Sequence, residues 1–106
     1  MVDEMIKLRK ILDDRNIEWQ DESSHYKLSM GGEIIIDRTH FTVKGHEFSV
    51  SNGFGTYGGY TARKEDNLGK LELMELGGGL YNNGEPVGHL FADDVIKQLE
   101  EIFGEI

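Results

Sequence analysis

Residues 41–50, Phe-Thr-Val-Lys-Gly-His-Glu-Phe-Ser-Val, decide the fold. Apolar and polar side chains alternate on both sides of Lys44-Gly45, which is the pattern of two strands joined by a two-residue turn. The turn fixes the predicted cross-strand pairs, which are Val43 with His46, Phe41 with Phe48, and Thr39 with Val50. The face that carries Phe41 and Phe48 is therefore expected to face the core.

The opposite face of this hairpin is predicted to be polar. It carries Arg38 and His40 on the first strand and Ser49 and Ser51 on the second. Two interpretations remain open, an ordinary solvated sheet face and a face that hydrogen-bonds a ligand. A serine in the middle of a strand lacks the strained turn and the oxyanion hole of a nucleophilic serine, so hydrolysis by a Ser-His arrangement is not expected.

Upstream of the hairpin, Ile34-Ile35-Ile36 forms a continuous apolar run. Adjacent side chains of a strand point to opposite faces, so the three isoleucines cannot all contact the core. We therefore expect a bulge or bend near Asp37.

Helices are predicted at both ends, over residues 3–15 and 92–103, because apolar side chains recur there at helical spacing. Asn16 is a plausible left-handed cap for the first helix. Further predicted strands cover residues 17–20 and 25–30, and residues 70–76 are either a strand, which we favour, or a helical turn. Pro86 is expected to place the following segment at a sheet edge or outside the sheet. The fold class is therefore α+β, a small antiparallel β-sheet with N-terminal and C-terminal helices packed on it, in a single domain over 1–106.

The chain has 106 residues and a net charge of −9, and it contains no cysteine. The charge argues against direct nucleic-acid binding, and the absence of cysteine excludes disulfides, Cys-ligated zinc and thiol catalysis. No secretory signal and no apolar run of membrane-spanning length is recognised, so a bacterial cytoplasmic location is expected. Because so short a chain buries a small core, we expect a homo-oligomer.

A glycine-aromatic block follows the hairpin, Asn-Gly-Phe-Gly-Thr-Tyr-Gly-Gly-Tyr over residues 52–60. It contains G-x-G-x-x-G but lacks the helix that a dinucleotide fingerprint needs. Glycine N–H groups could hold a phosphate, Tyr57 could stack on a base, and Arg38 or Arg63 could add positive charge. The candidate ligand-binding residues are Arg38, His40, Asn52, Gly53, Gly55, Thr56, Tyr57, Gly58 and Arg63. The alternative is a glycine-rich turn whose aromatic rings pack on the sheet; no cofactor and no metal site is expected.

Four stretches together resemble a family of small uncharacterised proteins from phages and prophages of Firmicutes. They are residues 38–41, 49–59, 71–74 and 84–88, and the N-G-x-G-T-Y-G-G block is the most specific of them. This chain departs from the family at Phe91, where a threonine would cap the second helix. The resemblance assigns no catalytic residue, but a phage origin implies stoichiometric binding of a host factor.

Three functions follow as hypotheses. The first is a non-enzymatic protein that sequesters a nucleotide-like signalling ligand and so counters host defence. The alternative is an acidic protein–protein inhibitor that binds a basic host defence protein, with a nucleic-acid mimic as one form. The third is a small nucleotide hydrolase that uses His40 and Asp37.

Overall fold

The central hairpin forms as its sequence predicts. In the computed structural model, which describes residues 1–53, 56 and 69–106, β3 (Glu33–Val43) and β4 (His46–Gly53) pair antiparallel. The three predicted cross-strand pairs are all present. Lys44 and Gly45 both take positive φ, +48° and +84°, as a two-residue hairpin turn requires.

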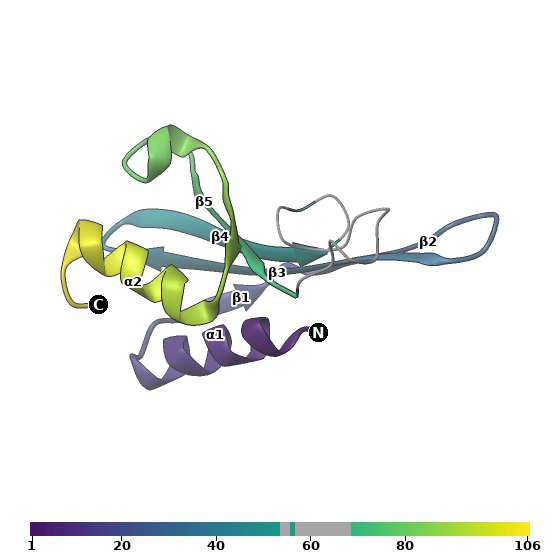
Figure 1. Cartoon of the computed structure of the whole chain (residues 1–106), viewed down its shortest axis with the longest axis horizontal. Helices are drawn as coiled ribbons and strands as arrows, with labels where there is room; N and C mark the ends of the chain where they lie inside the picture. Colours follow the sequence, from purple (N-terminus) through teal and green to yellow (C-terminus); the bar gives the residue numbers. More distant parts are fainter. Residues whose placement is uncertain (54–55, 57–68) are drawn as a thin grey trace.

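The rest of the chain builds a six-stranded antiparallel sheet around this hairpin (Figure 1). The strand order is β1-β3-β4-β5-β6, and β2 also pairs with β3. The other elements are α1 (Asp3–Asp14), β1 (Trp19–Asp21), β2 (Ser24–Lys27), β5 (Leu71–Leu76), the short 3₁₀ helix η2 (Asn82–Gly84), β6 (Val87–Leu90) and α2 (Ala92–Phe103). The α+β prediction is confirmed, and residues 70–76 are a strand.

The predicted bulge near Asp37 is wrong. β3 runs without interruption for 11 residues, and its register with β4 is continuous from Ile36 to Val43. The isoleucines need no bulge because they lie outside the packed part of the molecule. That packed part, the described chain apart from residues 24–36, is here called the body. Residues 24–36, which we call the arm, are β2, its turn and the start of β3, and they project as a two-stranded ribbon (Figure 1).

Both helices supply the core on one face of the sheet. Phe41, Phe48 and Val50 contribute the sheet side of this core, and α1 and α2 contribute the rest. The fully buried helix side chains are Met5, Leu8 and Leu12 from α1 and Ala92, Val95 and Leu99 from α2. Among the described residues, no helix is long and apolar enough to cross a membrane.

The two helices end differently. α1 ends at Asp14, one residue earlier than predicted, and Asn16 takes the expected left-handed conformation with φ +58°. α2 begins after Phe91, whose side chain forms no cap hydrogen bond. Instead, the Ala92 N–H donates to Glu4 of α1 at 2.7 Å. The first turn of α2 is thus capped by two carboxylates, Glu4 of the first helix and Asp94 within α2, which accepts the Phe91 N–H at 2.9 Å.

A buried carboxylate holds the segment between β5 and β6 against the sheet. Glu75 is 3% exposed and accepts a hydrogen bond of 2.8 Å from the Tyr81 N–H. Its second oxygen lies 3.5 Å from Nδ1 of His46. A Cβ atom at Gly78 would lie 1.8 Å from this carboxylate, so the close approach requires glycine there. β6 then forms the sheet edge, as Pro86 predicts.

Candidate functional site

The face of the sheet opposite the helices, here called the polar face, is lined by alternate residues of three strands. β3 contributes Arg38 and His40, and their partners across the ladder are Ser51 and Ser49 of β4. The next strand continues the pattern, because Glu72 pairs with Ser51 and Met74 with Ser49. The predicted grouping of Arg38, His40, Ser49 and Ser51 on one face is therefore confirmed.

A pocket of about 300 Å³ lies on the polar face. Its lining residues come from β3, β4, β5 and the connection between β1 and β2, and they are Glu22, Arg38, Ser49, Ser51, Glu72, Met74 and Leu76. One guanidinium, two carboxylates, two hydroxyls and two apolar side chains therefore surround a space the size of a small organic ligand.

Arg38 is held in place by both its side chain and its backbone. Its Nε donates to the Ser51 hydroxyl at 3.2 Å. Its backbone N–H donates to the Ser23 hydroxyl at 3.0 Å, and its carbonyl accepts the Glu22 N–H at 3.0 Å. These bonds engage Nε, and the two terminal guanidinium nitrogens form the fork with which an arginine binds an anion in two-pronged fashion.

The turn that carries Glu22 is ordered by its two neighbours in the chain. Asp21 accepts the Ser23 N–H at 3.0 Å and an Arg9 N–H at 3.2 Å. The hydrogen bonds from Ser23, more than the guanidinium of Arg9, hold the pKa of the Asp21 carboxyl below its ordinary value. Glu22 is thereby presented at the rim of the pocket.

His40 lies between two carboxylates beside the pocket. Its Nδ1 is 3.4 Å from Glu22, and its Nε2 is 3.7 Å from Glu47. The side chain is 17% exposed, and Nε2 is buried without a hydrogen-bond partner among the described residues. His40 therefore lies on the polar face but not among the residues that line the pocket.

Asn52 and Gly53 have structural contacts away from the pocket. Asn52 pairs with Asp37 across the ladder. Because adjacent residues of a strand point to opposite faces, Asn52 and Asp37 lie on the opposite side of the sheet from Arg38. The Asn52 side chain donates to the Lys70 carbonyl at 2.8 Å. A Cβ at Gly53 would lie 2.4 Å from the Ile35 carbonyl oxygen, so glycine allows β4 to approach β3 at this point.

Thr56 closes back on Gly53. Its N–H donates to the Gly53 carbonyl at 3.2 Å, and its hydroxyl accepts the Gly53 N–H at 2.9 Å. The remaining predicted residues lie outside the described residues, and they are Gly55, Tyr57, Gly58 and Arg63. Their phosphate-binding and stacking roles stay predictions.

The pair assumed for nucleotide hydrolysis is not brought together. Asp37 and His40 are three residues apart on one uninterrupted strand, so their side chains leave opposite faces of the sheet. Within residues 1–53, 56 and 69–106, no cluster of three or more His, Asp or Glu side chains could hold a metal ion.

Sequence reasoning missed four pocket residues, Glu22, Glu72, Met74 and Leu76. The last three could have been found, because alternation along the predicted strand 70–76 separates residues 72, 74 and 76 from Leu71 and Leu73, which the structure buries. Glu22 lies in a turn without periodicity, so only the three-dimensional arrangement places it. No known family model, curated protein or solved structure matches the chain.

Proposed function

We propose that this chain is a non-enzymatic binding protein that sequesters a small nucleotide-like ligand in the polar-face pocket. The observation that carries the proposal is the lining of that pocket, in which an ordered arginine, two carboxylates, two hydroxyls and two apolar side chains surround one space. The resemblance to phage proteins adds the expectation that the ligand is a signal used in host defence.

Each part of such a ligand has a chemical counterpart. Arg38 provides a charged fork for a phosphate or a similar anion. Glu22 and Glu72 can accept hydrogen bonds from ribose hydroxyls or base amino groups, as acidic residues do in dinucleotide-binding proteins. Met74 and Leu76 offer apolar contact to a flat ring. Hydroxyls of Ser49 and Ser51 complete the lining.

Size and charge narrow the ligand class. A pocket of about 300 Å³ is at the lower end of the range for small-molecule sites. Among the described lining residues Arg38 carries the positive charge, and one guanidinium matches one phosphate better than three. The ligand that fits best is a single nucleoside carrying one phosphate or a comparable anion.

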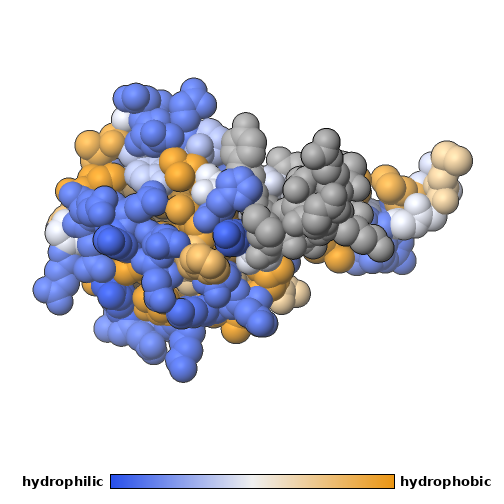
Figure 2. Space-filling model, viewed as in Figure 1, coloured by the Kyte–Doolittle hydropathy of each residue, from blue (hydrophilic) through white to orange (hydrophobic). Residues whose placement is uncertain are grey.

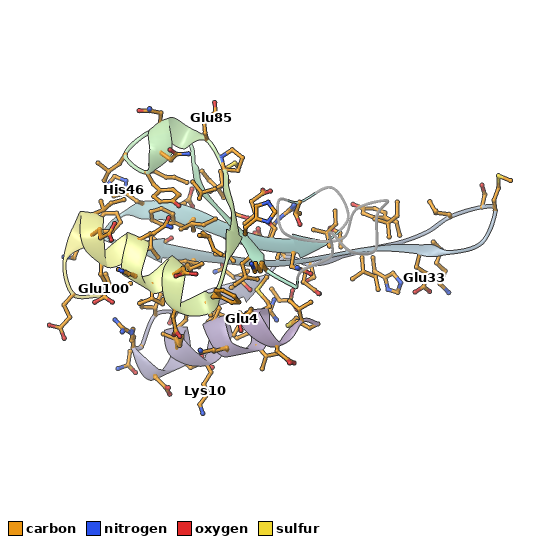
Figure 3. The ribbon with its side chains drawn as sticks, in the orientation of Figure 1. Glu4, Lys10, Glu33, His46, Glu85 and Glu100 are labelled. Atoms are coloured by element: carbon orange, nitrogen blue, oxygen red, sulfur yellow. The ribbon has the colours of Figure 1, made fainter. Side chains whose placement is uncertain are left out.

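The test is calorimetric titration with a panel of nucleosides and nucleoside mono-, di- and triphosphates. Arg38→Gln is expected to weaken monophosphate binding at least tenfold, because a charge-assisted hydrogen bond contributes about 1.5–3 kcal/mol. Lys10→Gln is the matched control, since it also removes one positive charge but lies on the outward side of α1 (Figure 3).

Equal binding by wild type and Arg38→Gln would show that the pocket is not the site. Mass spectrometry of the ligand after incubation separates sequestration from hydrolysis, because a sequestered ligand is recovered unchanged.

The acidic-inhibitor function remains the second candidate, favoured by the charge distribution. The arm contains one lysine and one glutamate, so the whole net charge of −9 lies on the rest of the molecule. A basic partner would bind there, and its affinity would fall steeply as salt is raised. Binding of a single nucleotide depends less on salt, so a salt titration distinguishes the two functions.

A further inference from the structure

We propose that the arm is a self-association surface through which a second copy of this chain binds, arm against arm. The inference is independent of the ligand. It starts from shape: the molecule measures 46 × 25 × 24 Å, and the arm extends along its long axis (Figure 1). A two-stranded ribbon is only marginally stable by itself, so a contact that covers one face would stabilise it.

The arm concentrates exposed apolar side chains. Eight large apolar residues are exposed in the described part of the chain, and four of them lie among these 13 residues. They are Tyr26 at 57%, Leu28 at 49%, Met30 at 98% and Ile35 at 48%. Figure 2 shows apolar surface at this projecting end. A concentration of exposed apolar side chains on a strongly charged protein is typical of an interaction site.

Three apolar side chains of the arm share one face of the ribbon. The register pairs Tyr26 with Ile34 and Ser24 with Ile36, so both isoleucines and the tyrosine share a face. The other face carries charged residues beside Ile35, because Lys27 pairs with Glu33 and His25 pairs with Ile35. Nε2 of His25 lies 3.0 Å from Glu33, so the charges are compensated within the arm.

The charge distribution favours the arm as the place where two copies of the chain make contact. Two molecules that each carry −9 repel one another, and the repulsion is weakest where a molecule is locally neutral. The arm has one lysine and one glutamate and is therefore neutral, and it projects away from the rest of the molecule (Figure 1). Two arms related by a two-fold axis would also offer each other the same apolar face, as a symmetric dimer interface requires.

The test is sedimentation velocity over a range of protein concentrations and salt. Wild type is expected to form dimers, and added salt is expected to strengthen them by screening the repulsion between bodies. Leu28→Ser is expected to weaken dimerisation at least tenfold, since the change is present in both copies. Leu80→Ser is the control, because Leu80 is also in a turn and is 53% exposed but lies on the body.

Circular dichroism and thermal unfolding check that both variants are folded. If Leu28→Ser disturbs the arm itself, Met30→Ser replaces it, because a side chain that is 98% exposed contributes little to the fold. A monomeric wild type at all concentrations would overturn the proposal. So would a dimer that Leu28→Ser and Met30→Ser leave intact, or a dimer that salt weakens. A dimer that Leu80→Ser retains and the arm variants lose would support it.

Discussion

The two halves of β3 are one strand in two environments. From Thr39 to Val43 it crosses the body, and every second side chain is buried. From Glu33 to Ile36 it belongs to the arm, and none of its side chains is buried although three of the four are isoleucine. Hydrophobic content alone therefore does not locate a core. Alternation does, because it shows that only one face has a partner.

The largest effect is expected when a core side chain of the body is removed. It tests whether the body, and not the arm, provides the stability of the fold. Phe48 is fully buried and its ring lies 5.9 Å from those of both Phe41 and Phe103. Phe48→Ala should lower the free energy of unfolding by about 4 kcal/mol. Ile34→Ala removes a half-buried side chain from the arm and should cost less than about 1 kcal/mol in the monomer.

Urea unfolding of both variants at a concentration that keeps the protein monomeric provides the measurement. Equal losses of stability would mean that the arm is part of the core and that the division of β3 is wrong.

Two His–Glu pairs, His46–Glu75 on the body and His25–Glu33 on the arm, allow the same comparison with smaller expected changes in stability. Glu75 on the body is buried and also holds the Tyr81 N–H, whereas Glu33 on the arm is about half exposed. Glu75→Ala should cost about 2 kcal/mol, because it leaves a buried donor unpaired. Glu33→Ala should change stability by less than about 1 kcal/mol, as is usual for an exposed ion pair. Thermal unfolding of the two variants measures both changes. A larger loss of stability in Glu33→Ala than in Glu75→Ala would contradict the expected difference.

The smallest effect is an alkaline loss of stability that originates on the body. Burial raises the pKa of Tyr81 to about 12 from an ordinary value of 10.0. The folded state therefore holds the phenol proton more tightly than the unfolded chain does. The stability that this tighter proton binding contributes is complete below pH 10 and is lost as the pH rises from 10 toward 12.

Unfolding free energies measured across that interval should fall less steeply in Tyr81→Phe than in wild type. Tyr26→Phe, on the arm, is the control and should leave the wild-type slope in place. An unchanged slope in Tyr81→Phe would assign the alkaline loss to other groups.

The parts of the fold that sequence could predict are those in which local and tertiary signals agree. Residues 41–50 combine alternation with a turn that only one register satisfies, and 92–103 has an unbroken helical stripe. The arm was missed because alternation is informative only for a strand with one buried face. Six of the seven pocket residues were accessible to sequence reasoning through alternation along β3, β4 and β5. Glu22 was not, because its position depends on hydrogen bonds from a turn to a strand 16 residues later.

The contact between Glu4 and Ala92 links the beginning of folding to its end. The two residues are separated by 88 positions, and a helix of 12 residues such as α2 is marginal in isolation. During synthesis the first helix emerges long before the backbone that it must cap. The last helix can complete its opening turn only after the sheet between them has brought the two together. Closure of this long loop should make folding slow and all-or-none, with the C-terminal helix as its final step.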